Sequence, residues 1–498
     1  MTQQETSRSW TRRQETSRPE TAADVDEVFE DEIFEDEVFK DEVFKDEVFK
    51  VETHGIDPIP DAERHGGAKD LFWLWFGSNL TFTYVINGAL AVAFGLSFWQ
   101  ATLVVVLSGL SFFAVSAAGL SGIRTGTATL VISRAAFGVR GNFPAGVLNW
   151  VVSIGYTIVN TVVGTLALEV FLAEIGLGQG TAIRALALGV TLALTFAVAM
   201  WGHATVQFAE RWMAYVLAVG FGALLVFVLP GADTSAPAAA PGLSGWSLAF
   251  VVMLAGPFSY LPMPADYTRY LPRTTSLRSI TWMGASGGFL SSVALGVAGV
   301  AAATQTDMTD AVAGAESLLP GWFQTVFLAL VLGGSVTNSI ITLYSSSLNL
   351  QVLGIPWSRS RAIVISAAVT AVGSLAALFL TDFTTSLLSF LSLLIIVFAP
   401  WGGVFLADML LRRCRYDSDA LHAGSAGAYW YRAGYHPAGM TALLAGMLFA
   451  ALTCDSELWT GPLVAPLGGA DLTLLGSVVS GLVYWALVRR APADTPAA

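Results

Sequence analysis

The chain has 498 residues, of which 54% are hydrophobic and 12% are charged, and its mean hydropathy is +0.63. These values exclude a soluble globular protein and predict a helical, polytopic membrane protein whose first partner is the lipid bilayer. Many of the acidic residues that give the net charge of −12 lie in the first 66 residues, so the charge of the membrane part is considered separately. No nucleic-acid partner is expected.

Residues 1–66 are polar and acidic, and they contain five tandem pentapeptides of the form DEVF[EK] between Asp26 and Lys50. A period of five advances a helix by about 500°, so the repeated Val-Phe pairs would not share one face. We therefore predict a disordered cytoplasmic tail.

Twelve apolar segments are long enough to form membrane helices. We predict spans at residues 71–96, 99–119, 143–172, 183–201, 213–230, 248–268, 279–303, 322–352, 362–380, 384–407, 438–454 and 470–488. From residue 67 onward there are 17 Lys and Arg, and with a cytoplasmic N-terminus all except Arg184 fall on the cytoplasmic side. This distribution predicts a multi-pass protein of the inner or plasma membrane with both termini in the cytoplasm.

The sixth span ends in a proline-rich stretch, AGPFSYLPMPADYTRYLPR, at residues 255–273. Each proline removes a backbone N–H and clashes with the preceding turn, so we expect the helix to break with Phe258, Ser259 and Tyr260 in the break. Freed backbone groups at bilayer depth are tolerated where they line a cavity, and transporters bind substrate at such interruptions. A kinked helix without a ligand is the alternative.

The first span carries four polar side chains near its middle: Asn79, Thr81, Thr83 and Asn87. Polar groups at this depth normally face a helix bundle or a cavity. The first span is therefore the second candidate for a broken helix that lines a site.

Two stretches resemble signatures of the purine-cytosine permease family of nucleobase:cation symporters. One is Asp266-Tyr267-x-Arg269-Tyr270-Leu271-Pro272 after the sixth span, and the other is GLSGIRTGTATLVISRAAFGVRGN in the loop at 119–142. The resemblance covers about residues 53–490 and implies the family's LeuT-type fold. In that fold, two inverted five-helix repeats form a transport core, which here covers residues 67–407 with repeats at about 67–230 and 248–407. We expect a cytoplasmic loop at 408–437 and two additional helices at 438–490 to follow the core.

The resemblance also implies a nucleobase site. Tyr156 stands where family members often have Trp, and we expect it to stack on the base together with Phe258 or, alternatively, Tyr260. A carboxamide presents both a donor and an acceptor, so Asn338 is the strongest candidate for reading the edge of the base. Further candidate contacts are Asn160, Asn79 and Ser259. Core packing and helix-to-helix hydrogen bonding are the structural alternatives for these side chains.

Sodium-coupled relatives bind the cation between carbonyls of the first span and two hydroxyls of the eighth. Thr337 matches one hydroxyl and Val336 replaces the other, while Ser335 and Thr83 are further candidate ligands. A hard cation prefers several oxygens, so Val336 favours H+ over Na+ as the coupling ion. No cofactor is expected, and sodium is the one metal implied.

Asp266 lies three residues before Arg269 at the end of the sixth span, and we expect the two to form a gating pair.

The sequence has no Walker loop for ATP and no catalytic set in its spans, so an enzyme is not expected. We expect a secondary active transporter that imports a nucleobase, with cytosine or a purine favoured, by cation-coupled alternating access. A carrier for hydantoin, allantoin, uracil or a vitamin on the same fold is the alternative. A non-transporting membrane sensor of bases that signals through its tail is less favoured.

Overall fold

The computed structural model describes residues 55–200, 203–236, 238–239, 242–354, 357–380, 383–456 and 459–490. They belong to one of two units of the chain, Lys50–Ala498. The acidic repeats and the rest of the predicted tail up to residue 54 lie outside the described residues.

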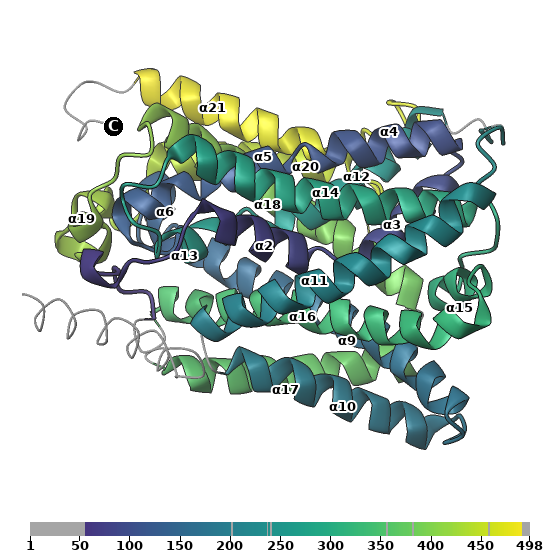
Figure 1. Cartoon of the computed structure of the whole chain (residues 1–498). Coiled ribbons are helices and arrows are strands. Elements are labelled where there is room, and N and C mark those ends of the chain that lie inside the picture. The colour runs from purple at the N-terminus through teal and green to yellow at the C-terminus, as the bar shows by residue number, and fades with distance from the viewer. Residues whose placement is uncertain are drawn as a thin grey trace, which may run out of the picture. The chain divides into compact units, whose positions relative to one another are not determined.

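The described residues form α-helices joined by short turns, and no β-strand occurs among them (Figure 1). The long helices are α2 (Ala68–Ser78), α3 (Thr83–Ala93), α4 (Phe98–Gly109), α9 (Phe143–Glu174), α10 (Thr181–Ala199), α11 (His203–Val228), α12 (Gly242–Tyr260), α14 (Leu277–Ala303), α16 (Gly321–Val352), α17 (Arg359–Phe379), α18 (Phe383–Leu411), α20 (Pro437–Thr453) and α21 (Gly476–Arg490). Short helices are α5 (Phe112–Ala118), α6 (Leu120–Thr125), α7 (Thr129–Ile132), α8 (Arg134–Phe137), α13 (Pro264–Thr268), α15 (Ala311–Ser317) and α19 (Ser418–His422), and 3-10 turns are η1 (Asp61–Glu63), η2 (Leu229–Gly231), η3 (Gly424–Ala426), η4 (Ala428–Trp430) and η5 (Thr473–Leu475).

Nine helical segments within the described ranges are at least 18 residues long and apolar enough to cross a membrane. They coincide with nine of the predicted spans. The other three predicted spans are helical too, since the first is divided into α2 and α3, and the last two are α20 with 17 residues and α21 with 15. The prediction of an all-helical, multi-pass membrane protein is confirmed.

The first span is broken, as its polar centre predicts. Helix α2 ends at Ser78 and α3 begins at Thr83, with Asn79 capping the first half. Both halves rest on α14, and the contact with α3 is made by backbone: a Cβ on Gly88 would collide with the Gly296 carbonyl. Glycine at such positions allows two helices to approach closely.

The sixth span is broken as well, but three residues later than the sequence predicts. Helix α12 continues through Pro257, so the expectation that Phe258–Tyr260 lie in the break is wrong. The break comprises residues 261–263, and α13 starts with Pro264. A proline in the first turn of a helix removes an N–H that would have no partner there, so the later prolines determine where the helix restarts.

The helices pack in distinguishable groups. Helix α9 packs along α16, with α10 and α17 against this pair, whereas α14 packs against α2, α3, α4 and α5. Helix α12 contacts α3, α4 and α18, and α18 packs with α20 and α21. The broken helices therefore stand between the α9–α16 pair and the helices around α14.

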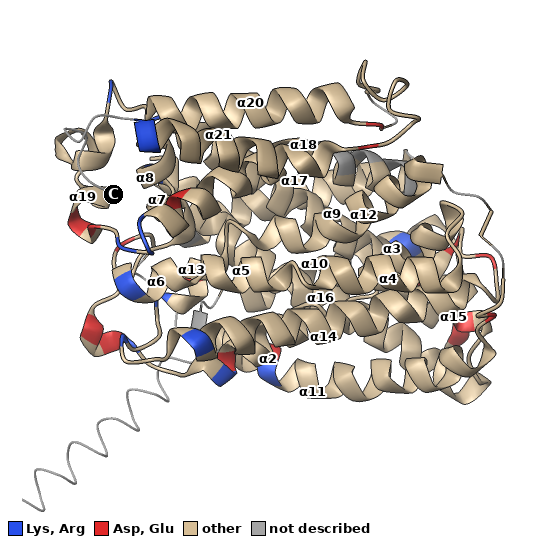
Figure 2. Ribbon diagram, turned by 90° about the horizontal axis from the view of Figure 1, so that it is seen from above, with Lys and Arg blue, Asp and Glu red and all other residues tan. Residues whose placement is uncertain are grey.

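Lys and Arg gather at the end of this unit where α6, α8, α13 and α19 lie, which we name the basic end (Figure 2). Arg184 belongs to the opposite end, where it pairs with Glu169 near the close of α9 at 2.7 Å. The two ends of the helices thus differ sharply in charge.

Candidate functional site

A small cavity lies where both broken helices meet α9 and α16. It is lined by Thr81, Thr83, Tyr84, Asn87, Tyr156, Asn160, Gly256, Tyr260 and Asn338. Its volume is about 10 Å³, which is about the room that one water molecule needs. The structure is closed around this point.

Two carboxamides connect α9 to α16 within the lining. Asn160 Nδ2 donates to Asn338 Oδ1 at 2.7 Å. Asn160 Oδ1 accepts from the hydroxyls of Thr81 at 3.1 Å and Thr83 at 3.3 Å. The third span, the eighth span and the break of the first span therefore share one hydrogen-bonded network.

Asn338 extends this network to the ends of the two broken helices. Its Nδ2 donates to the Ser78 carbonyl at 2.7 Å and to the Tyr260 hydroxyl at 2.6 Å. Ser78 is the last residue of α2, and Tyr260 is the last residue of α12. One amide group thus responds to a movement of either broken helix.

Two buried polar atoms of the lining have no hydrogen-bond partner within the part of the chain that the structure describes: the Tyr156 hydroxyl and Asn87 Oδ1. A buried group left unpaired costs about 1–3 kcal/mol, so such atoms point to a ligand or water that completes them. From the sequence, Asn87 is noted as one of the polar residues of the first span but is not assigned a contact with the substrate. Its position four residues after Thr83, on the same face of α3, is the signal for such an assignment.

Three tyrosines line the cavity, Tyr84, Tyr156 and Tyr260, and the last two include the rings expected to stack on a base. The Tyr156 ring meets Phe390 of α18 edge-on with a centroid distance of 5.2 Å, and the Tyr260 ring meets Trp75 of α2 at 5.2 Å. Phe258 is not part of the lining and packs, half-buried, against hydrophobic clusters on both sides of it. The aromatic residue that α12 contributes is therefore Tyr260, the alternative considered from sequence.

Asn79 and Ser259 do not line the cavity but form hydrogen bonds with residues next to it. Asn79 Oδ1 accepts from the Tyr84 hydroxyl at 2.7 Å, and its Nδ2 donates to the Trp75 carbonyl at 2.7 Å. The Ser259 hydroxyl donates to the Gly256 carbonyl at 2.6 Å. These contacts fix the shape of the cavity wall from outside.

The candidate cation ligands do not share one place. Thr83 lines the cavity, whereas Ser335 and Thr337 lie on α16 outside its lining. The buried Ser335 hydroxyl has no hydrogen-bond partner among the described residues, and the Thr337 hydroxyl donates to the Gly334 carbonyl at 3.0 Å. Gly334 in turn touches the Leu80 carbonyl in the break of the first span.

No group of three His, Cys, Asp or Glu side chains in the described ranges could hold a metal ion. A cation at the contact of α16 with the first span would therefore rely on hydroxyl and carbonyl oxygens, which are the ligands a hard cation prefers.

The two predicted gating residues are both buried at the basic end. Asp266 accepts hydrogen bonds from the Thr129 backbone N–H at 2.9 Å and from its hydroxyl at 3.2 Å. Arg269 donates to the Gly55 carbonyl at 2.7 Å and to the Tyr344 hydroxyl at 3.3 Å. Helix α13 and the residue that follows it are thereby fastened to the first residue of α7, to α16 and to the segment before α2.

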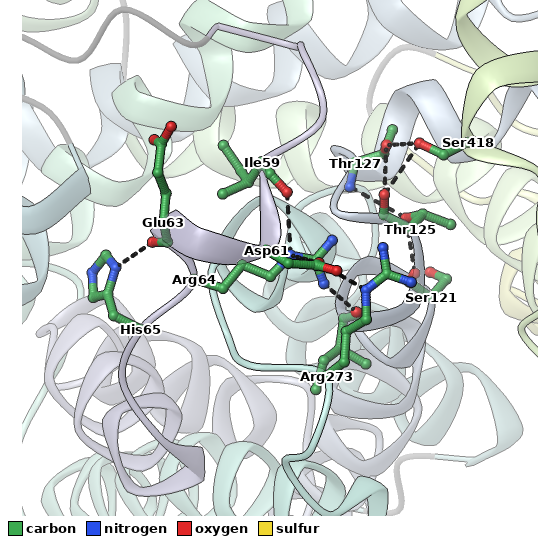
Figure 3. A network of polar contacts seen from close by, with 11 residues as sticks. Ile59, Asp61, Glu63, Arg64, His65, Ser121, Thr125, Thr127, Arg273 and Ser418 are labelled. Atoms are coloured by element: carbon green, nitrogen blue, oxygen red, sulfur yellow. Dashed lines mark hydrogen bonds and ion pairs between the residues drawn. The ribbon is translucent and has the colours of Figure 1, made fainter. Parts of the chain in front are cut away.

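Residues 55–65, which the sequence places in the tail, form a latch across the basic end (Figure 3). The Ile59 N–H donates to the Gly126 carbonyl at 2.9 Å, and Arg64 Nη1 donates to the Ile123 carbonyl at 2.7 Å. Arg273 pairs with Asp61 at 2.8 Å, and its hydrogen bond, followed by the charge of Arg64, lowers the pKa of the Asp61 carboxyl. The basic end is closed by this latch together with α13.

A second cavity of about 600 Å³ lies toward the opposite end. It is bounded by α3, by Val163 and Leu166 of α9, and by the segment from Ala303 to Val312 that leads into α15. Ile86 lines this cavity and its neighbour Asn87 lines the small one. The second cavity is thus within the usual size range of small-molecule pockets, and adjacent residues of α3 line it and the small closed cavity.

A family model for permeases of cytosine/purines, uracil, thiamine and allantoin matches residues 58–474. YxlA of Bacillus subtilis, which is named provisionally as a purine-cytosine permease, is 27% identical over 456 residues, covering 88% of this chain and 96% of YxlA. The purine-cytosine permease FCY21 of Saccharomyces cerevisiae is 26% identical over 479 residues, covering 87% of this chain and 85% of FCY21. These relatives are permeases and not enzymes.

Two solved structures share the fold. Mhp1, a transporter of the nucleobase-cation-symport-1 family in a closed conformation with bromovinylhydantoin bound, matches with a TM-score of 0.71 at 20% identity, covering 88% of this chain and 95% of Mhp1. A Na+-coupled sialic acid symporter matches with a TM-score of 0.56 at 12% identity, covering 87% of this chain and 92% of the symporter. The predicted LeuT-type fold is confirmed, and the chain belongs to the purine-cytosine permease family, the nucleobase:cation symporter-1 family, as a multi-pass membrane permease.

Proposed function

We propose that this permease imports a nucleobase, with cytosine or a purine favoured, by cation-coupled alternating access. The observation that carries the proposal is the Asn160–Asn338 pair at the meeting point of two broken helices, flanked by the Tyr156 and Tyr260 rings. A flat heterocycle rimmed with donors and acceptors is the ligand that such a set suits. The purine-cytosine permease name of FCY21 supports the same substrate class.

Selectivity would come from the amides and not from the rings. Stacking contributes about 1–3 kcal/mol per base and depends little on the identity of the base. A base that takes the place of the Tyr260 hydroxyl as the partner of the Asn338 amide must offer a hydrogen-bond acceptor. An analogue without that acceptor leaves buried groups unpaired. Asn87 Oδ1 and the Tyr156 hydroxyl are further groups that the base could complete.

We assign the basic end to the cytoplasm, since cytoplasmic loops of membrane proteins are rich in Lys and Arg. The cavity of about 600 Å³ then faces outward, and the latch and α13 close the inner side. Import would require release of the contacts that Thr129 makes with Asp266 and that Ile123 makes with Arg64.

Uptake by the purified, reconstituted protein tests this function. We expect liposomes that contain the full chain to accumulate labelled cytosine or a labelled purine when a proton gradient is imposed. A thermal-shift screen with cytosine, purines, uracil, hydantoin and allantoin, with and without sodium, would rank the substrates. Stabilisation by hydantoin or allantoin alone would favour the alternative carrier, and binding without uptake would favour a sensor.

A further inference from the structure

Glu210 of α11 is a buried ionisable residue without a partner in the described part of the chain. It has no solvent-exposed surface, and neither of its carboxyl oxygens has a hydrogen-bond partner within the described residues. Other carboxyl groups in or beside the spans have partners: Glu169 pairs with Arg184, Asp266 with Thr129 and Asp408 with Arg412. A carboxyl that serves only to join helices would be paired in the same way, so Glu210 calls for another explanation.

The carboxyl of Glu210 faces the end of the first half of the broken first span. A Cβ added to Gly77, in the last turn of α2, would lie 2.9 Å from Glu210 Oε2 and 2.9 Å from its main-chain carbonyl oxygen. The absence of a side chain at Gly77 therefore leaves the space that the carboxyl occupies.

Among the charged groups near Glu210 along the chain and on α2, Arg211 and Asp70 pair with each other, and Lys69 lies in the first turn of α2. Arg211 points outward and forms an ion pair with Asp70 of α2, with 47% of the Arg211 side chain exposed. Glu210 thus directly precedes an exposed residue in the chain, although it is itself enclosed.

The remaining elements packed against α11 present few ionisable groups. On α12 and α13, which are not among the main neighbours of α11, Tyr260 and Tyr267 carry neutral hydroxyls that make no hydrogen bond to the Glu210 carboxyl. Helix α16 contains no Asp, Glu, Lys, Arg or His between Gly321 and Val352, and its one tyrosine is Tyr344. Helices α14 and α10 each carry a single charged residue, Arg278 and Arg184, in their first turns. No charged group on these helices neutralises Glu210.

Glu210 is connected to the candidate site through the end of α2. Gly77 precedes Ser78, whose carbonyl accepts the hydrogen bond from Asn338 at 2.7 Å. The last carbonyls of a helix carry partial negative charge, so an ionised carboxyl beside them is repelled and a neutral one is not. A change in the protonation of Glu210 would therefore change how closely the end of α2 can approach α11, and with it the position of the Ser78 carbonyl at the site.

We propose that Glu210 is the residue that carries the coupling proton. The carboxylate takes up one proton from the outer medium while the basic end is closed, and it releases the same proton to the cytoplasm when the end of α2 separates from α11 at the opening of that end. This assignment rests on the proposed import of a base and names the group that links it to the proton gradient.

Glu210→Gln tests the assignment, because glutamine keeps the size of the side chain and stays neutral. In liposomes, we expect the variant to exchange labelled base against unlabelled base at a rate within about twofold of the unmodified protein. Its accumulation driven by a pH gradient should fall to the equilibrium level, with no base-induced proton entry detected by an internal pH dye. Glu169→Gln, the same change on α9, should still accumulate base and carry protons.

The results separate the two proposals. If the unmodified protein moves no base at all, the import function fails. If it accumulates base and the Glu210→Gln variant does so equally under the pH gradient, only the assignment of Glu210 fails, and the same holds if sodium alone drives the unmodified protein. Should the Gln variant not fold, Glu210→Asp decides: the pH of half-maximal uptake should move, and an unchanged pH profile would overturn the assignment.

Discussion

Asn160 Nδ2 lies 2.7 Å from Asn338 Oδ1, and this hydrogen bond is the direct link between the third and eighth spans at the candidate site. Asn338→Ala removes it together with the bonds to Ser78 and Tyr260. We expect base affinity to fall by about 1–3 kcal/mol, because the partner groups left behind are buried. Isothermal titration of the purified variant measures the loss.

Asn349→Ala is the matched control for this change, since Asn349 is a buried amide on the same helix that does not line the cavity. It should leave base affinity within about twofold. Unchanged affinity in Asn338→Ala, with normal folding, would show that Asn338 serves only to join helices.

Substitutions of Tyr156 separate the contribution of its ring from that of its hydroxyl. Tyr156→Trp should keep or tighten base binding, since it enlarges the stacking face, and Tyr156→Ala should weaken binding by about 1–3 kcal/mol. Tyr156→Phe removes only the unpaired hydroxyl. Competition binding with a labelled base gives the order, and equal behaviour of the Ala and Trp variants would rule out a stacking role.

Val336 gives a prediction about the coupling ion. Val336→Ser adds a hydroxyl between Ser335 and Thr337 on α16, near the contact of Gly334 with the Leu80 carbonyl. We expect base uptake by the unmodified protein to depend weakly on sodium and this variant to depend on it more, because sodium gains an oxygen ligand. Initial uptake rates at a series of sodium concentrations, with the membrane potential clamped, measure the change. Steep sodium dependence without the substitution would mean that the existing oxygens already complete the site.

The latch at the basic end should contribute to stability mainly through Arg64. The Arg64 side chain donates to the carbonyls of Ile59 at 3.2 Å and Ile123 at 2.7 Å, so Arg64→Ala leaves buried acceptors unpaired. We expect a loss of about 1–3 kcal/mol, seen as a lower unfolding temperature in detergent. Arg273→Ala breaks an exposed ion pair with Asp61 and should change the unfolding temperature little, because solvent screens such a pair. Equal losses in both variants would contradict the central place of Arg64.

His436 makes the stability of the loop before α20 depend on pH. Its ring stacks on Tyr431 with a centroid distance of 4.2 Å, its Nδ1 lies 2.9 Å from the Ala136 carbonyl oxygen, and burial lowers its pKa. The unfolded chain therefore binds a proton at this residue more readily, and stability falls as the pH drops below about 6.5 towards the lowered value.

His436→Gln should flatten the decline of the unfolding temperature between about pH 7 and pH 5. Part of the slope will remain, because burial also lowers the pKa of His422. A slope identical to that of the unmodified protein would show that His436 does not titrate in this range.

The sequence predicts the helices and both breaks because each signal is local. Polar residues from Asn79 to Asn87 indicate the first break, and the prolines after Gly256 indicate the second. The exact place of the second break depends on which proline can occupy the first turn of a new helix, and Pro264 does. That choice follows from tertiary packing, so the predicted position is three residues early.

The roles of side chains are harder to predict, since they depend on how each helix is rotated about its axis. Glu210 and Arg211 read in the sequence as an ordinary charged pair near the end of a span. The rotation of α11 instead turns Arg211 outward to Asp70 and Glu210 inward to Gly77. Likewise, Phe258 and Tyr260 are equivalent aromatic residues by composition, and only the packing of α12 places Tyr260 at the cavity.

Helices α3 and α14 meet through backbone, because a Cβ on Gly88 or on Gly299 would collide with a carbonyl of the opposite helix. Gly287 brings α14 equally close to the backbone of α2. Both halves of the first span are thus anchored to one helix, with the four residues 79–82 between them. Of these four residues only Thr81 lines the cavity, whereas Leu80 and Phe82 are buried in the hydrophobic core. Substrate preference can therefore change at Thr81 while the glycine contacts and the two flanking core residues hold both half-helices in place.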